Sequence, residues 1–147
     1  MSNWTRMTRE LTHEAVRAAL DAAVQEALAL RIRVNVAVVD ASGALLGFLR
    51  MPGAFLHSAD IAIDKAYTAA GFRLPTGAWI EVLEGHSPAV RQGLPARPRF
   101  VGFGGGFPLF ADGELVGGIG ISGGSEEQDE ACARAACAAL GMAPDRA

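Results

Sequence analysis

The sequence predicts an α/β fold of the α+β type, with a mostly antiparallel central sheet of about five strands flanked by helices. Two observations lead to this prediction. Hydrophobic residues follow helix and strand periodicity in the order α-β-β-α-α-β-β-α, and turn residues join neighbouring strands into hairpins. The chain of 147 residues is 50% hydrophobic and 20% charged, which excludes a disordered chain. We expect residues 1–147 to form a single domain.

The first third of the chain has the pattern of a helix followed by a β-hairpin. Apolar residues recur at three- and four-residue spacing from about Thr12 to Leu30, and Thr12 is a suitable helix N-cap. Valines then alternate with other residues over 34–39, and residues 40–43 have turn composition. We expect residues 44–50 to form the returning strand.

The middle of the chain is predicted to be helical and then irregular. A helix runs from about Ser58 to Phe72, and a short helix follows over residues 79–83. Ser87 and Pro88 have the residue types of a helix start, because serine caps helices and proline suits the first helical position. The rest of this region is rich in proline and arginine and is expected to be a loop.

Three strands and one helix are predicted in the last third. The predicted strands are residues 100–103, 107–111 and 114–122. Asp112 and Gly113 form a hairpin turn, because both central residues of a type I′ turn need positive φ. Ser125 and Gln128 have capping-box spacing at the start of the last helix, and Gly141 is expected to end it.

Charge and hydropathy limit the expected partners. The chain has 13 Lys+Arg against 16 Asp+Glu and no basic block, which argues against nucleic-acid binding. No stretch approaches the roughly 18 apolar residues that cross a membrane, and the N-terminus lacks the apolar core of a secretory signal. We expect a cytoplasmic protein that binds a small molecule. Its 18 glycines and many alanines favour close packing and a homo-oligomer.

The sequence contains none of the standard metal or nucleotide motifs. HExxH, CxxC, EF-hand and Walker patterns are missing, so no metal site is predicted, and the glycine stretches do not give GxGxxG between a first strand and a helix. Cys132 and Cys137 lie five residues apart on one predicted helix, where they are poorly placed to bond to each other. They are most simply small core residues.

Two histidines are candidate functional residues. His57 follows a loop and opens a helix on which Asp60 and Asp64 are neighbours, so a carboxylate could orient its imidazole for acid/base work. The alternative is a helix-end histidine that only caps. Asp60 and Asp64 could also hold a divalent cation, although a solvated or salt-bridged face, with Lys65 as neutralising neighbour, is favoured. His13, in the first helical turn, is either a ligand for a flat cofactor or an ordinary surface residue.

Gly123 and Gly124 are a candidate anion site. They place backbone N–H groups at the start of the last helix, an arrangement that suits a carboxylate or propionate. The alternative is a tight turn with a well-capped helix. Arginines near the predicted loops, Arg50 among them, could pair with a ligand carboxylate.

The stretch GFPLFADGELVGGIGISGG at residues 106–124, followed by Gln128-Asp129-Glu130, resembles the signature of the GlcG/HbpS family, which includes the C-terminal domain of PduO. Residues 36–40, Arg50-Met51 and Lys65-Ala66 agree, so the resemblance covers about residues 8–141. It implies a profilin-like or roadblock-like fold, assemblies from dimers up to octamers, and haem binding in several members. Pro52 replaces a common acidic residue, and Arg97-Pro98-Arg99 looks individual to this chain.

Two functional hypotheses follow. In the first, the chain binds haem or a related tetrapyrrole, with His13, His57 or a cysteine as axial ligand and arginines or the Gly123 and Gly124 amides meeting the propionates. In the second, it is a cofactor-independent isomerase, hydrolase or lyase acting on a carboxylated or aromatic metabolite. The roles would then be His57 as acid or base, Asp60 or Asp64 as its orienting group, Arg50 as carboxylate clamp and the Gly123 and Gly124 amides as anion stabilisers. A pure assembly module is a third possibility.

Overall fold

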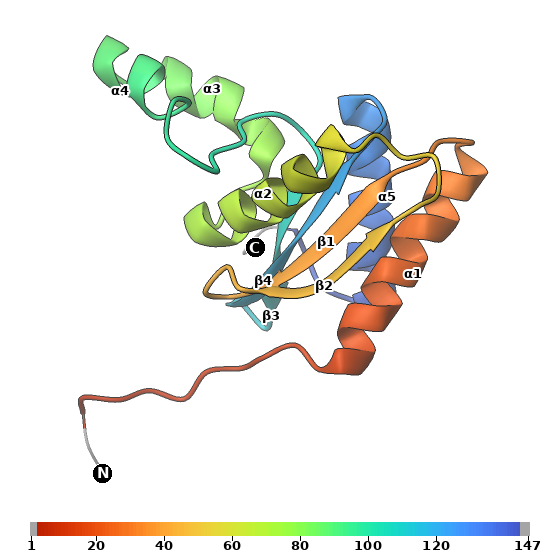
Figure 1. Ribbon diagram of the computed structural model, residues 1–147. Helices are drawn as coiled ribbons and strands as arrows, with labels where there is room; N and C mark the ends of the chain where they lie inside the picture. The colour runs from red at the N-terminus through yellow and green to blue at the C-terminus, as the bar shows by residue number, and fades with distance from the viewer. Residues whose placement is uncertain (1–2, 145–147) are drawn as a thin grey trace.

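A four-stranded antiparallel sheet with helices on both faces forms the framework of the protein (Figure 1). The computed structural model describes residues 3–144. The strands are β1 (Asn35–Asp40), β2 (Leu45–Arg50), β3 (Gly106–Ala111) and β4 (Glu114–Ser122), in the order β2-β1-β4-β3. The helices are α1 (His13–Ala29), α2 (His57–Phe72), α3 (Trp79–Glu84), α4 (Pro88–Gly93) and α5 (Glu126–Leu140), with a 3₁₀ turn over Thr76–Ala78. The predicted α+β class is confirmed.

Helices α1 and α5 cover one face of the sheet and enclose the larger hydrophobic core. Their ends follow from local chemistry. The Thr12 hydroxyl accepts a hydrogen bond from the Ala15 amide at 3.2 Å, and Ser125 forms a capping box with Gln128. Gly141 ends α5 in the left-handed conformation, at φ +63°. All three predicted helix ends are therefore confirmed.

Helix α2 covers the other face of the sheet at very short range. Its alanines pack against Ala37 and Val39 of β1. On β4, a Cβ atom at Gly118 would lie 2.6 Å from the Ala66 carbonyl oxygen, and one at Gly120 would collide with the Ala62 carbonyl oxygen. Glycine at these two positions therefore lets the helix backbone rest almost directly on the strand.

The sheet has four strands in the part of the chain that the structure describes, not about five. The predicted strand at residues 100–103 is irregular backbone. Side chains from distant segments satisfy amides of this segment and of the glycines after it: Val101 N–H donates to the Thr68 hydroxyl at 3.1 Å, and Gly104 N–H donates to a Glu126 carboxylate oxygen at 2.8 Å. The structure also has a second short helix, α4, between α3 and β3, which adds one helix to the predicted order. Its Ser87 cap and leading proline are as predicted.

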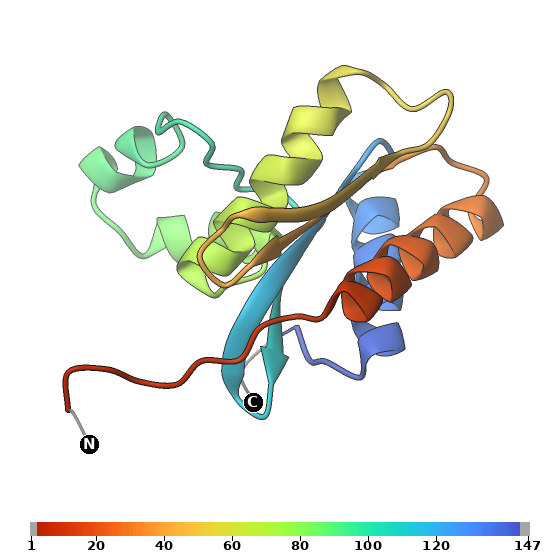
Figure 2. The same ribbon diagram turned by 60° about the horizontal axis from the view of Figure 1, so that its bottom comes forward.

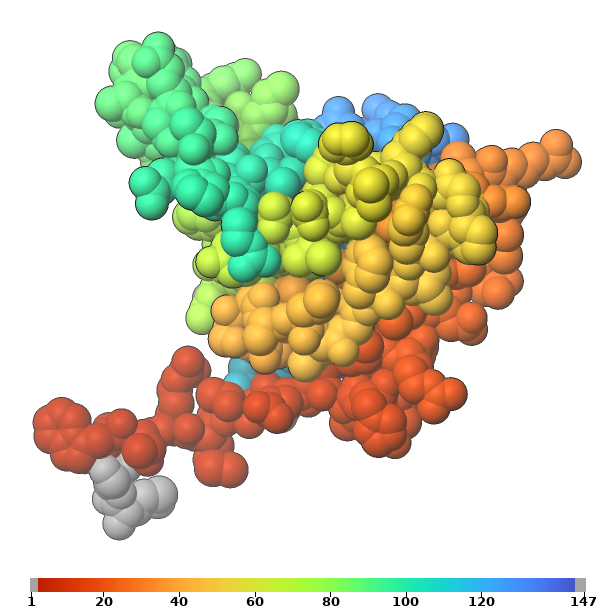
Figure 3. All heavy atoms as spheres, viewed as in Figure 1, coloured from red at the N-terminus to blue at the C-terminus, as the bar shows by residue number. Residues whose placement is uncertain are grey.

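The N-terminal arm, residues 3–10, extends away from the body of the molecule (Figures 2 and 3). Arg9 attaches the base of the arm to the β3–β4 turn, since its guanidinium lies 2.6 Å from an Asp112 carboxylate oxygen and its amide donates to Glu114 at 3.2 Å. None of the described helices is both long enough and apolar enough to cross a membrane.

Candidate functional site

The loop between β2 and α2 presents two large apolar side chains and a histidine to solvent. Phe55 and Leu56 are 69% and 68% exposed, and His57, the first residue of α2, is also exposed. We call these three residues the His57 surface. They lie at the start of α2, where the chain leaves the edge strand β2 (Figure 1).

Hydrogen bonds to the loop backbone fix the His57 surface in place. The Arg50 guanidinium donates to the Ala54 carbonyl oxygen through two nitrogens, at 3.0 and 3.3 Å. The Asn35 side-chain amide donates to the Phe55 carbonyl oxygen at 3.1 Å. Arg50, predicted as a clamp for a ligand carboxylate, is therefore engaged in holding the loop that carries Phe55.

The structure does not join His57 to either predicted orienting carboxylate. Among the described residues, no hydrogen bond or ion pair links His57 to Asp60 or Asp64. Asp60 is exposed, and an Asp64 oxygen lies 2.9 Å from Arg99 Nε in an ion pair. The acid/base arrangement that the sequence suggested is thus not assembled, and Asp64 belongs to a salt-bridged face of α2.

His13, the other histidine named as a candidate ligand, lies at the first position of α1. Its side chain is 81% exposed, and Nε2 lies 3.2 Å from a carboxylate oxygen of the neighbouring Glu14. It therefore has polar neighbours in Thr12 and Glu14, whereas His57 follows two exposed apolar side chains.

The Gly123-Gly124 turn binds a carboxylate from its own chain. Gly124 N–H donates to Asp129 Oδ1 at 2.9 Å, and the other Asp129 oxygen lies 3.0 Å from Lys65 Nζ. Lys65 also donates to the Ile121 carbonyl oxygen at 2.8 Å. A ligand anion at these amides would have to displace Asp129, so the geometry favours the tight-turn alternative.

Lys65 and Asp129 form a buried ion pair that sequence reasoning missed. Their side chains are only 1% and 4% exposed. Burial lowers the pKa of Lys65 and raises the pKa of Asp129, while the attraction between the two groups opposes both shifts. The sequence suggested that Lys65 neutralises Asp60 or Asp64. In the structure it pairs with Asp129 instead. A signal was present, because Lys65 falls on the inward face of α2 together with Ala62, Ala66 and Ala69.

The two cysteines are buried in the core between α1 and α5. Cys132 is 0% exposed and Cys137 is 3% exposed. Burial raises the pKa of the Cys132 thiol to about 12 and that of the Cys137 thiol to about 11. A cysteine that ligates iron does so as an accessible thiolate, and burial therefore disfavours both cysteines as ligands.

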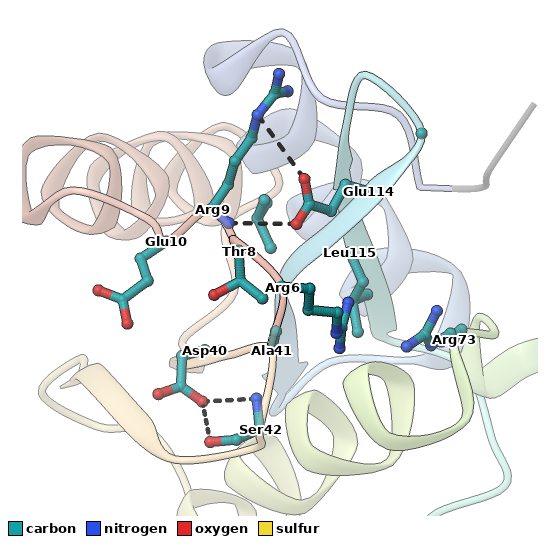
Figure 4. A pocket seen from close by; sticks show the side chains of 12 residues that line it. Arg6, Thr8, Arg9, Glu10, Asp40, Ala41, Ser42, Arg73, Glu114 and Leu115 are labelled. Carbon is teal, nitrogen blue, oxygen red and sulfur yellow. Dashed lines mark hydrogen bonds and ion pairs between the residues drawn. The ribbon is translucent and has the colours of Figure 1, made fainter. Parts of the chain in front are cut away.

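One cavity of the structure holds none of the predicted site residues. It has a volume of about 640 Å³ and lies between the N-terminal arm, the β1–β2 turn and the end of α2 (Figure 4). The Asp40 carboxylate, which lines this cavity, already accepts hydrogen bonds from Ser42 and Ala44. These hydrogen bonds lower the pKa of Asp40. Within residues 3–144, no group of three or more His, Cys, Asp or Glu side chains is arranged to hold a metal ion.

A family model described as "Haem degrading protein HbpS-like" matches residues 11–138. The chain belongs to the HbpS-like family. It is 40% identical over 132 residues to the corrinoid adenosyltransferase PduO of Salmonella typhimurium, covering 88% of this chain but only 38% of that protein. It is 32% identical over 112 residues to protein GlcG of Escherichia coli, covering 76% and 81% of the two chains. The resemblance seen in the sequence is therefore confirmed.

Among solved structures, the HbpS-like chain is similar to one described as a PduOC:haem complex, with a TM-score of 0.86 and 37% identity. The match covers 93% of this chain and 99% of that one. The glycine-rich signature at residues 106–124 forms the β3–β4 hairpin, on which α2 rests. In this HbpS-like chain the signature therefore supports packing, and the candidate ligands His13 and His57 lie outside it.

Proposed function

We propose that this chain binds haem or a related tetrapyrrole at the His57 surface, with His57 as the iron ligand. The observation that carries the proposal is an exposed imidazole directly following two large exposed apolar side chains on a fixed loop. Membership of the HbpS-like family and similarity to a structure described as a haem complex support the choice of ligand.

The groups at this surface match the chemistry of haem. Phe55 and Leu56 offer apolar contact for the flat ring, and a neutral imidazole is a common axial ligand of haem iron. Arg33 lies beside the loop, since its Cγ would be 3.7 Å from a Cβ at Gly53, and it is a candidate partner for a propionate. When bound, haem supplies redox and ligand-binding chemistry at its iron, while the chain contributes the imidazole, the apolar contact and the cation.

Self-association is the second part of the proposal. The edge strand β2 leads into the His57 surface and carries three exposed leucines: Leu45 at 48%, Leu46 at 43% and Leu49 at 36%. An edge strand with exposed apolar side chains and unpaired backbone groups is a favourable docking site for another strand. A second copy at this edge would bury the leucines beside the bound macrocycle.

The test is a titration of the purified protein with haemin, followed by absorption. Wild type is expected to show a saturable Soret shift at one haem per chain or fewer. His57→Ala is expected to weaken binding by about tenfold or more, because the iron loses its axial nitrogen. His13→Ala tests the second candidate ligand, and His86→Ala, which removes another exposed histidine, is the control. An unsaturable change that no variant alters would overturn the proposal.

A further inference from the structure

A second cavity, between α2, the β1–β2 turn and the loop over residues 94–100, has the features of a binding site for a small aromatic carboxylate. Its volume is about 330 Å³, at the lower end of ligand cavities. We call it the Tyr67 pocket, and the residues that define it are Tyr67, Phe72, Leu94, Arg97, Arg99 and Phe100. It shares no residue with the His57 surface. We propose that it binds a monocarboxylate with a single aromatic ring.

Aromatic side chains that hold one another in place form one wall of the Tyr67 pocket. Phe72 and Phe100 both pack edge-on against Trp79. The ring centroid of Trp79 lies 4.8 Å from that of Phe72 and 5.1 Å from that of Phe100. Trp79 is buried, whereas Phe72 is 50% exposed and lines the cavity. Packed aromatic rings with one open side are suited to stacking against the ring of a ligand.

The loop that carries Arg97, Arg99 and Phe100 is held on α2 by one hydroxyl group. Thr68, which is 3% exposed, donates to the Arg99 carbonyl oxygen at 3.0 Å and accepts from the Val101 amide at 3.1 Å. Arg99 adopts φ +66°, a conformation that costs a non-glycine residue energy and therefore needs such support. The pocket is accordingly formed before any ligand enters it, which favours binding.

The two arginines of the pocket differ in whether the guanidinium already has a partner within the chain. The Arg99 guanidinium lies 3.6 Å above the Tyr67 ring and forms an ion pair with Asp64, so its charge is compensated. The Arg97 side chain has no hydrogen bond or ion pair within residues 3–144. An uncompensated cation beside an aromatic wall is the combination that recognises an aromatic ring bearing one carboxylate.

The test uses benzoate as the probe and isothermal titration calorimetry as the measurement. We expect saturable binding of benzoate, and binding of the neutral analogue benzamide at least about tenfold weaker. Arg97→Gln should weaken benzoate binding by about tenfold or more, because a charge-assisted hydrogen bond is lost. Arg91→Gln, which removes an exposed cation of α4 that does not line the pocket, should leave binding unchanged.

The location is checked by fluorescence in a Trp4→Phe background. The chain has two tryptophans, so this variant leaves Trp79, behind the aromatic wall, as the reporter. Benzoate should change its emission, and haemin affinity should be the same with and without benzoate and in Arg97→Gln. Absence of saturable benzoate binding, equal binding of benzamide, an unchanged Arg97→Gln, an unchanged Trp79 emission or competition with haemin would each overturn the proposal.

Discussion

The buried pair Lys65–Asp129 shows how single residues tie this fold together. Lys65 comes from α2, Asp129 comes from α5, and the Ile121 carbonyl oxygen that Lys65 also reaches belongs to β4. One ammonium group therefore links helices on both faces of the sheet. Buried pairs of this kind add little net stability, but each partner depends strongly on the other.

Removing one partner of this pair should be much more damaging than removing both. Asp129→Leu leaves a charged lysine without a partner and is expected to cost about 3–5 kcal/mol of unfolding free energy. Lys65→Met combined with Asp129→Leu should recover most of that loss. Urea denaturation of wild type and these two variants measures this, and a double variant no more stable than Asp129→Leu would contradict the account.

Asp40 should give stability a dependence on acid pH. Hydrogen bonds from Ser42 and Ala44 lower its pKa below the ordinary value of 3.8, so the folded state favours the ionised form. That contribution is present above the unfolded pKa and is lost as pH falls through the folded one. Asp40→Asn keeps the acceptor oxygen but cannot titrate. It should therefore lose less stability than wild type between pH 5 and pH 2, by about 0.5 kcal/mol for a group so near the surface. Urea denaturation at each pH measures this, and the same pH dependence in Asp40→Asn and wild type would contradict it.

At the scale of elements, the close contact of α2 with β4 accounts for the small residues on both. Gly118 and Gly120 face the backbone of α2 at Ala62 and Ala66, where no side chain would fit. This explains why the most recognisable stretch of the sequence is so rich in glycine. The glycines of residues 106–124 that face α2 allow this helix to approach β4 closely.

Gly120→Ala should separate α2 from β4 and cost about 3 kcal/mol or more, because the added Cβ meets rigid backbone. Gly71→Ala is the matched control on α2, since nothing lies within 4 Å of its Cβ position. The control should be neutral or stabilise the protein by up to about 1 kcal/mol. Thermal unfolding of both variants decides the point, and an unaffected Gly120→Ala would be inconsistent with the packing described.

Elements set by local chemistry could be predicted from the sequence, and elements set by distant partners could not. The caps of α1 and α5 and the Asp112-Gly113 turn depend on residues within a few positions of each other. Residues 100–103 have strand-like composition, but the Val101 amide donates its hydrogen bond to the Thr68 hydroxyl of α2 and not to a neighbouring strand. At the candidate site, His57 could be singled out from its place after a loop. The pairing of Lys65 with Asp129, 64 residues away, could not.

At the scale of the whole molecule, exposed apolar residues gather along one edge of the sheet. Leu45, Leu46 and Leu49 of β2 continue into Phe55 and Leu56, while the opposite edge strand, β3, is buried over most of its length. An apolar edge of this kind is a liability in an isolated chain and an interface in an assembly. The proposed haem surface and the proposed contact between copies therefore meet along β2.

Leu46→Glu should shift the protein toward the monomer in sedimentation velocity, because two copies paired at this edge would bury unpaired carboxylates. Ile80→Glu places the same charge at an exposed apolar position of α3, away from the edge, and should leave the assembly as it is in wild type. The same assembly state in Leu46→Glu and wild type would contradict the β2 interface.

The measurement that tests the central claim most directly is imidazole rescue of the ferric haem complex. In His57→Ala, the Soret band of the wild-type complex should be lost, and added imidazole should restore it by replacing the missing axial nitrogen. His13→Ala and His86→Ala should keep the wild-type spectrum without imidazole. A His57→Ala complex with an unchanged spectrum, or loss of the band in His13→Ala instead, would contradict His57 as the ligand.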